Sequence, residues 1–342
     1  TLDMGRERAL LGKVGEQAGE ELADYTQSVY RTILAAGRSY QNACSGVTSK
    51  VYETIRKALD TTPDLFPQRA TVACQGVEGA YSQIACDSIF KAPTILYFNT
   101  FEHVFKAVES GMCQYGVLPI ENSTAGSVNA IYDLMTKHNF SIVRSARLKV
   151  SHNLLCKHGV KKEDIKEIFS HQQAISQCAG YLSTLKGVKV TVVEYMPRMM
   201  PLEDEEVSKA MVENTALAAQ MVAQSERRDV AALSSRFCGE LYGLNRLEQN
   251  VQDQNNNYTR FICISKNSEI YPGADRTSLM MTLPHKPGAL YNVLSKFYAL
   301  GINLRKLESR PLPDREFEFM FYFDLDASVY SPELINLLSE ME

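Results

Sequence analysis

The sequence lacks the features that mark several large classes of protein. Its eight cysteines include no C-x-x-C pair and no histidine at zinc-ligand spacing, so neither a disulfide framework nor a metal site is expected. No apolar run approaches the length of a membrane span, and no signal-peptide pattern is visible. We therefore expect reduced, mostly buried thiols and a cytoplasmic protein that does not bind membranes.

A basic surface and nucleotide-binding motifs are also missing. Lys plus Arg is 36 and Asp plus Glu is 40, which gives a net charge of −4, and no basic stripe with interleaved aromatic residues is present. Neither G-x-G-x-x-G nor G-x-x-x-x-G-K-[ST] occurs. Nucleic acids, dinucleotides and nucleoside triphosphates are thus disfavoured as ligands, and no cofactor is expected.

The chain contains three successive regions that differ in their hydrophobic pattern. Its 342 residues are enough for two or three domains. Residues 1–60 space their apolar side chains at three and four, which predicts helices. Residues 61–69, "TTPDLFPQR", contain two prolines and are expected to form a linker. In residues 70–267 short apolar runs alternate with helical ones, which predicts an α/β domain with a largely parallel sheet.

Two further segments interrupt or follow this α/β region. An acidic, proline-containing insert at 197–213 is predicted to be a surface excursion without chemistry. Residues 275–342 show the order β-α-β-β-α, that of a ferredoxin-like unit without its last strand. Because the chain also starts at Thr1 without a methionine, we expect that both ends have been shortened.

Polar junctions follow the predicted strands of the α/β domain. They are "QGVEGAYS" (75–82), "ENSTAGS" (121–127), "SHQQ" (170–173), "NTA" (214–216) and "LSS" (233–235), each at the expected start of a helix. Ligands of open α/β sheets bind beyond the carboxyl ends of the strands, and helix N-termini present unpaired N–H groups there. Five junctions together favour a site for a small organic acid, whereas any single one is better explained as an ordinary helix cap.

One more segment, "NNNYTRF" at 255–261, combines a row of amides with a neutral donor and a fixed cation. Thr259 and Arg260 precede the apolar run "FICIS", in which Phe261 is expected to enter the core. This composition is consistent with a polar pocket at the mouth of a buried strand. The alternative is that Thr259 only satisfies backbone groups at the end of the strand.

These motifs resemble a known family. "GVEGAYS", "LPIENSTAGSV", "FSHQQAISQC", "NTALAA" and "NNNYTRF" occur in the order seen in prephenate dehydratase. "HKPGALY" and "NLRKLESRP" resemble a phenylalanine-sensing ACT regulatory domain, and "DMGRERALL…RTILAAGRSYQ" resembles the later helices of an AroQ-type chorismate mutase. The whole resembles a bifunctional chorismate mutase–prephenate dehydratase shortened at both ends.

The resemblance implies an architecture and a reaction. It implies a two-lobed, periplasmic-binding-protein-like dehydratase domain with parallel-rich sheets over 70–267, a mutase-like helical region at 1–60 and an ACT domain at 275–342. It also implies that prephenate loses CO2 and water to become phenylpyruvate, in L-phenylalanine biosynthesis. Arogenate dehydratase, whose substrate differs by an amine, and a non-catalytic receptor for small acids are the alternatives.

The resemblance also assigns residues to the site. Thr259 is expected to donate a hydrogen bond to the departing hydroxyl without adding charge. Asn122 and Gln173 would donate amide N–H groups, and Glu121 would orient its neighbours. His171 either titrates near neutral pH or caps a helix, and Gln172 stands where the family usually has proline. The catalytic set is Glu121, Asn122, Gln173 and Thr259; the substrate-binding set is Ser123, Ser170, His171, Thr215, Arg260 and Phe261, where Arg260 either pairs with a carboxylate or braces the loop.

In ACT domains, paired copies close over L-phenylalanine, so a homo-oligomer (dimer or tetramer) and feedback inhibition are implied; the alternative is a domain that only pairs subunits. The allosteric residues implied are Gly288, Ala289, Leu290, Asn303, Leu304, Glu308, Ser309, Arg310 and Pro311. The mutase remnant implied is Asp3, Arg6, Glu7 and Gln41. Because the first mutase helix with its cations is absent and Gly37 replaces a serine, little mutase activity is expected, and a helical dimerisation arm is the alternative.

Overall fold

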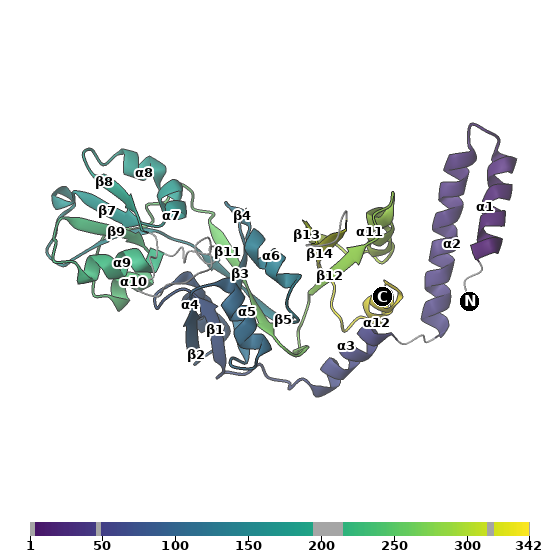
Figure 1. Ribbon diagram of the computed structural model, residues 1–342, viewed down its shortest axis with the longest axis horizontal. Coiled ribbons are helices and arrows are strands. Elements are labelled where there is room, and N and C mark those ends of the chain that lie inside the picture. The colour runs from purple at the N-terminus through teal and green to yellow at the C-terminus, as the bar shows by residue number, and fades with distance from the viewer. Residues whose placement is uncertain (1–3, 46–48, 194–214, 313–317, 342) are drawn as a thin grey trace, which may run out of the picture. The chain divides into compact units, whose positions relative to one another are not determined.

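The computed structural model describes residues 4–45, 49–193, 215–312 and 318–341 (Figure 1). The chain divides into two compact units: residues 1–61, 273–309 and 321–342 form one, and residues 62–272 and 310–320 form the other. Asp3 and the insert at 197–213 lie outside the described residues. No helix in the described ranges is both long enough and apolar enough to cross a membrane.

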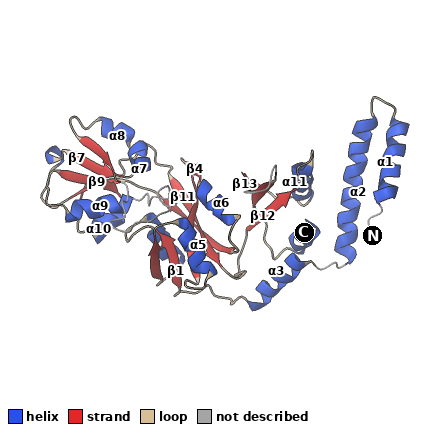
Figure 2. Cartoon of the chain, in the orientation of Figure 1, coloured by secondary structure: helices blue, strands red, loops and turns tan. Residues whose placement is uncertain are grey.

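The N-terminal residues form helices, as their apolar spacing predicts. α1 (Met4–Ala18), α2 (Ala23–Ser45) and α3 (Lys50–Thr61) follow one another, and α1 and α2 lie antiparallel and side by side (Figure 2). Gly19 makes the turn between α1 and α2 with φ +78°, a conformation that favours glycine. An ion pair between Glu7 and Arg38 also joins the two helices.

The C-terminal residues show the predicted order β-α-β-β-α. The elements are β12 (Thr277–Leu283), α11 (Ala289–Ala299), β13 (Leu304–Pro311), β14 (Phe319–Leu325) and α12 (Pro332–Met341). The strands pair in the order β12-β14-β13, and Phe297, Tyr322 and Phe323 form the buried centre. Gly288 precedes α11 in the left-handed conformation, with φ +81°.

The other unit contains two sheets, which we call sheet A and sheet B. Sheet A has the order β2-β1-β3-β11-β5, with β4 paired to β3. β1, β2 and β3 are parallel, whereas β11 runs antiparallel to β3 and β5. The strands are β1 (Thr71–Gln75), β2 (Thr94–Phe98), β3 (Tyr115–Asn122), β4 (Gly126–Ser127), β5 (Ser141–Lys149) and β11 (Tyr258–Ser265).

Both faces of sheet A are covered, which explains its apolar strands. α4 (Tyr81–Ile89) packs on the face that carries Val117 and Cys263. α5 (Phe101–Glu109) packs on the opposite face, where a Cβ at Gly116 would meet Val104 and Val108. α6 (Asn129–Met135) follows β4 and contacts α5 and β3.

Sheet B has the order β10-β6-β9-β7-β8, and its three neighbouring strands β9, β7 and β8 are parallel, with β8 at the edge. Its strands are β6 (Asn153–Cys156), β7 (Glu167–Ser170), β8 (Lys189–Val192), β9 (Val230–Ser234) and β10 (Asn245–Glu248). Its helices are η1 (Lys162–Asp164), α7 (Gln172–Gln177), α8 (Ala179–Ser183), α9 (Thr215–Gln224) and α10 (Arg236–Leu241). The predicted α/β fold with parallel-rich sheets is therefore confirmed.

The chain passes between the two sheets twice, at residues 150–152 and 249–257. Backbone hydrogen bonds hold the two crossing segments together: Val150 N donates to Asn257 O at 2.9 Å, and Val251 N donates to His152 O at 2.9 Å. Because the polar residues of "SHN" and "NNN" lie on these segments, the crossings bring together residues that are about a hundred positions apart in the sequence.

One predicted helix start is wrong. "ENSTAGS" was expected to lead from a strand into a helix, but it forms a tight hairpin turn from β3 into β4. Gly126 reaches φ +82°, and Asn122 binds the backbone of the turn, so the chain reverses before α6 begins.

The predicted linker also has a structural role, since Phe66 packs on Phe90, Tyr115 and Tyr271.

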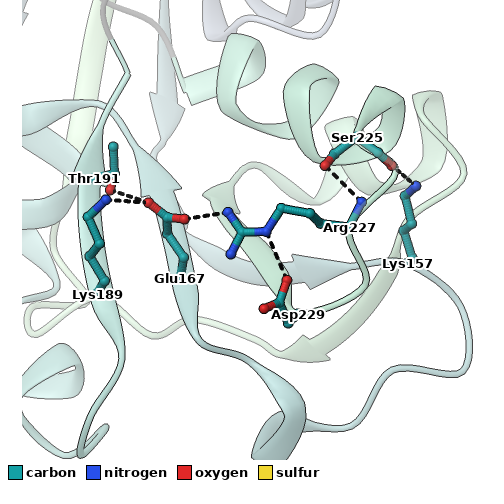
Figure 3. Close-up of polar contacts among 7 residues, drawn as sticks. All are labelled: Lys157, Glu167, Lys189, Thr191, Ser225, Arg227 and Asp229. Atoms are coloured by element: carbon teal, nitrogen blue, oxygen red, sulfur yellow. Dashed lines mark hydrogen bonds and ion pairs between the residues drawn. The ribbon is translucent and has the colours of Figure 1, made fainter.

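A cluster of charges joins the N-terminal ends of the three parallel strands of sheet B, β9, β7 and β8 (Figure 3). Glu167, which is 8% exposed, accepts hydrogen bonds from Arg227 at 2.6 Å, Thr191 at 2.7 Å and Lys189 at 2.9 Å. Arg227 also donates to Asp229 at 2.9 Å. Arg227 first, and then Thr191 and Lys189, lower the pKa of Glu167 from its ordinary 4.5 to about 2.

This pKa predicts a loss of stability in acid. A carboxylate whose pKa is depressed by folding stabilises the native state above its unfolded pKa, and the contribution disappears as pH falls through the folded pKa. Glu167→Gln should therefore lower the urea midpoint at neutral pH, and its difference from wild type should shrink from about pH 5 to about pH 2. The exposed Glu163→Gln serves as control; a Glu167→Gln difference that stays constant with pH would contradict the assignment.

Candidate active site

The centre of the site is the pairing of Thr259 with Asn122. These residues lie directly opposite each other on β11 and β3, so their side chains share one face of sheet A. The Nδ2 of Asn122 donates to the Oγ1 of Thr259 at 2.9 Å. Both residues are half-buried.

The direction of this hydrogen bond is set by the turn after β3. The Oδ1 of Asn122 accepts from Thr124 N at 3.0 Å, Ala125 N at 2.9 Å and Thr124 Oγ1 at 2.7 Å. A backbone N–H can only donate, so the side-chain oxygen must face the turn and the side-chain nitrogen must face Thr259. Thr259 therefore accepts, and among the residues that the structure describes this is the single hydrogen bond of its Oγ1.

Asn122 is also part of a closed ring of four side chains, which we call the amide ring: Asn122, Asn257, Gln177 and Thr124. Asn122 donates to Asn257 Oδ1 at 2.7 Å, and Asn257 donates to Gln177 Oε1 at 2.8 Å. Gln177 donates to Thr124 Oγ1 at 3.3 Å, and that hydroxyl donates back to Asn122. Since Gln177 ends α7 of sheet B, the amide ring links the two sheets.

Arg260 and Glu121 pair with each other next to the amide ring. Arg260 Nη1 lies 3.4 Å from Glu121 Oε1, and the two residues are register partners on β11 and β3. Successive strand residues point to opposite faces, so this pair lies on the face of sheet A away from Thr259. That placement favours a bracing role for Arg260.

Phe261 is 2% exposed and packs in the core, as expected from its position in the strand.

The remaining predicted residues have mainly structural contacts. Ser123 fastens the turn to the amide-rich loop, because its hydroxyl donates to Asn256 O at 2.6 Å and accepts from Tyr258 N at 2.9 Å. Ser170 is fully buried and donates to Leu233 O at 2.8 Å. The carbonyl of Thr215 accepts from Ser234 Oγ at 2.9 Å.

The α7 junction differs from one of the two readings of its sequence. His171, at 7% exposure, precedes α7 but makes no side-chain capping bond, so the helix-cap alternative is wrong. Gln173 is exposed and is not a member of the amide ring. Gln177, one helical turn later on the same face, takes that place, and the spacing of the two glutamines was the available signal.

The loop at 76–80 packs onto sheet B and needs its second glycine. Gly79 has φ +92°, and a Cβ there would lie 3.1 Å from Cys238 Sγ and from Leu241. Cys238 Sγ donates to Gly79 O at 3.1 Å. The Tyr81 hydroxyl donates to Ser151 O at 2.7 Å, and burial raises its pKa. The loop thus positions the crossing segment at 150–152.

The other predicted residues lie as follows. Gly288, Ala289 and Leu290 form the start of α11, and Leu304, Glu308, Ser309 and Pro311 belong to β13. Asn303 donates to Asp326 at 2.9 Å, and Arg310 donates to both oxygens of Asp133 at 2.8 and 2.9 Å. Arg6 and Glu7 lie on α1 and Gln41 on α2. Within the described ranges, no group of three or more His, Cys, Asp or Glu residues can hold a metal ion.

Among the cysteines whose side chains the structure describes, seven are free and buried, as the sequence predicts for reduced thiols. They are Cys74, Cys86, Cys113, Cys156, Cys178, Cys238 and Cys263. Burial raises the pKa of Cys156 and of Cys178, the latter to about 12, so these thiols are poor nucleophiles at neutral pH.

A mixed α/β fold whose two sheets share a set of neutral donors is suited to binding a small organic acid. The profile of the prephenate dehydratase family matches residues 72–196 and 199–269, which is more than half of the chain. An arogenate dehydratase/prephenate dehydratase of Arabidopsis thaliana is 35% identical over 286 residues, covering 80% of this chain and 70% of the relative. The chain belongs to the prephenate dehydratase family, a family of lyases.

Further relatives agree with this assignment. A bifunctional chorismate mutase/prephenate dehydratase of Neisseria gonorrhoeae is 32% identical over 258 residues, covering 75% of this chain and 66% of the relative. A prephenate dehydratase structure from Arthrobacter aurescens, in complex with L-Phe, has a TM-score of 0.67 at 25% identity, covering 79% of this chain and 84% of that chain. A structure described as GqqA, a quorum quenching acylase, has a TM-score of 0.68 at 31% identity, covering 80% and 93%.

Proposed function

We propose that this protein catalyses the decarboxylating dehydration of prephenate or arogenate, with Thr259 as the donor to the leaving hydroxyl. The observation that carries the proposal is the fixed direction of the Asn122–Thr259 hydrogen bond. Because the threonine oxygen accepts from Asn122, its own proton points elsewhere and is available to a substrate. The donated bond from Asn122 also polarises the hydroxyl and makes it a stronger donor.

The neutrality of the amide ring suits the charge of the substrate. Prephenate carries two carboxylates, and an ionised carboxylate beside the leaving group would repel it. Formation of the aromatic ring drives loss of CO2, so the departing hydroxyl needs a preorganised donor more than a strong acid. In the proposal, Glu121 is kept away by its pair with Arg260, while Ser170, His171 and Thr215 border the substrate from sheet B.

The proposal leaves two candidate substrates, prephenate and arogenate. The A. thaliana relative is named for both arogenate and prephenate, and the N. gonorrhoeae relative for prephenate. The two substrates share the ring, its carboxylate and the leaving hydroxyl, and differ in an amine on the side chain, away from the proposed donor. Arogenate is therefore at least as well supported as prephenate, and the geometry at Thr259 serves both.

Mixing the purified protein with each acid tests the function. We expect release of CO2 with phenylpyruvate formed from prephenate, or phenylalanine from arogenate, and competition between the two acids for one site. The ratio of the two kcat/KM values gives the preference. Absence of turnover with both acids would contradict the proposal, and amide hydrolysis, in line with the acylase name of one related structure, would then be assayed.

Substitution of Thr259 tests the donor. Thr259→Ala should lower kcat about 100-fold to 1,000-fold, as for removal of one preorganised donor, with KM little changed. Thr259→Val keeps the shape and should be equally impaired, whereas Thr259→Ser keeps the hydroxyl and should recover most activity. A change in KM alone would show that Thr259 binds the substrate and does not assist the leaving group.

The C-terminal segment supports a regulatory proposal. Its β-α-β-β-α order, the left-handed Gly288 before α11 and the "ESRP" end of β13 are the features of the ACT resemblance. The A. aurescens relative was solved in complex with L-Phe. We infer that residues 275–342 form an ACT domain in a homo-oligomer that binds L-phenylalanine through the segments at 288–290 and 303–311.

Phenylalanine at millimolar concentration is expected to inhibit turnover and to change the sedimentation coefficient. Gly288→Val should weaken both effects, because a β-branched residue does not tolerate the left-handed conformation there. Tyrosine at the same concentration is the control ligand. Turnover and sedimentation that do not change at saturating phenylalanine would contradict the regulatory proposal and leave the dehydratase proposal intact.

For residues 1–60 the exposed surface favours a helical arm that mediates oligomerisation. Leu22, Tyr25, Val29 and Ile33 of the α2 region are all more than half exposed and recur at spacings of three and four. Such a stripe requires a partner helix.

The cytoplasmic location stays a prediction, since the A. thaliana relative is named as chloroplastic.

A further inference from the structure

Two side chains outside the predicted site complete the arrangement around Thr259. Gln177 ends α7, and His152 lies on the crossing segment at 150–152. His152 is 2% exposed, and its Nε2 lies 2.9 Å from Gln177 Oε1. Neither residue was assigned to the site from the sequence, and the buried imidazole of His152 makes a side-chain hydrogen bond through Nε2 alone, which is unusual for a buried polar group.

The direction of every bond in this chain follows from the turn after β3. Asn122 must donate to Asn257 Oδ1, because its own oxygen faces the backbone N–H groups. The side-chain oxygen of Asn257 is occupied by this bond, so Asn257 faces Gln177 with its amide nitrogen. An amide nitrogen donates, so the atom of Gln177 that it meets must be the acceptor Oε1. This oxygen accepts from both neighbours, and the Nε2 of His152 must therefore carry the proton.

The same reasoning determines the state of the other imidazole nitrogen. With the proton on Nε2, the Nδ1 of His152 is a bare acceptor, and it has no hydrogen-bond partner among the described residues. Burial lowers the pKa of His152, and the nearby His171 lowers it further, while Gln177 opposes the shift. His152 is thus a neutral imidazole with one permitted tautomer, and it holds the Gln177 oxygen in place.

We propose that Gln177 and His152 are positioning residues for Thr259: the turn sets the direction of the Asn122 amide, and Gln177 and His152 hold Asn257 in place as its second acceptor, which keeps that amide fixed against Thr259. Backbone N–H groups fix the amide ring at the sheet A end, and the imidazole N–H fixes it at the sheet B end. If Gln177 turned its amide over, its nitrogen would face the donors of Asn257 and His152. Without His152, Gln177 and Asn257 gain freedom to rotate, and Asn122 then loses one of its two acceptors.

The kinetic part of this inference rests on the proposed dehydratase function, and it is tested with paired variants of the full chain. Gln177→Met removes the bridge, and Gln172→Met makes the same change on the exposed face of α7. We expect Gln177→Met to lower kcat roughly 10-fold to 100-fold, as for partners that orient a reacting group, with KM within about twofold, and Gln172→Met to match wild type. Equal kcat values for the two variants would overturn the proposal.

At His152 the matched pair is His152→Gln and His152→Leu. Glutamine retains an N–H near the place of Nε2, whereas leucine has a similar size and no donor. We expect His152→Leu to lower kcat as Gln177→Met does, and His152→Gln to recover at least half of the loss. Circular dichroism verifies folding. If both His152 variants are unfolded, the comparison of Gln177→Met with Gln172→Met decides the test, because Gln177 is half-buried at the end of α7.

A spectroscopic test separates this inference from the proposed function. The ¹⁵N shifts of the His152 ring in labelled wild-type protein at neutral pH should show a protonated Nε2 and a bare Nδ1. In the Gln177→Met variant, the preference for the tautomer with the proton on Nε2 should weaken. A proton on Nδ1 in wild type would overturn the inference, whatever the activity. Conversely, a protein that turns over neither acid but shows the Nε2–H tautomer would contradict only the dehydratase proposal.

Discussion

The site depends on the saturation of one side-chain oxygen. Asn122 Oδ1 accepts from the backbone N–H groups of Thr124 and Ala125, which can only donate. The amide nitrogen therefore has to face away from the turn, and it orders Thr259 on one side and the amide ring on the other. A short hairpin turn thus decides where a proton is available, because hydrogen bonds in a closed network constrain each other's direction.

In the proposed mechanism, a network of neutral groups also keeps the reacting groups apart from the charges that stabilise the fold. The amide ring orients dipoles before a substrate arrives, so little reorganisation is needed when charge develops. The nearest opposite charges, Arg260 and Glu121, neutralise each other on the other face of sheet A. The cluster around Glu167 lies at the start of β7, whereas Ser170 and His171 lie at its end, so the strand length keeps the stabilising ion pairs away from the site.

Much of the fold was predictable because the relevant signals are local. Helical spacing in residues 1–60 and the alternation of strands and helices after residue 70 each reflect the period of one element. The turn at "ENSTAGS" was misread, since a polar run after a strand is compatible with a helix cap or with a hairpin, and the pairing of β4 with β3 decides between them. Motif resemblance singled out Asn122 and Thr259, which the structure brings into contact, but it gave no role to Gln177, which belongs to the amide ring.

By itself the sequence determined the elements, the family resemblance and the residue types that the chemistry requires, because these depend on neighbours within a few positions. Only the tertiary structure decided which side chains meet. The two crossings bring His152 and Asn257 beside Gln177, and the register of β11 on β3 places Thr259 opposite Asn122. Those contacts depend on pairing between distant strands, and the direction of each hydrogen bond then follows from the fixed donors of the backbone.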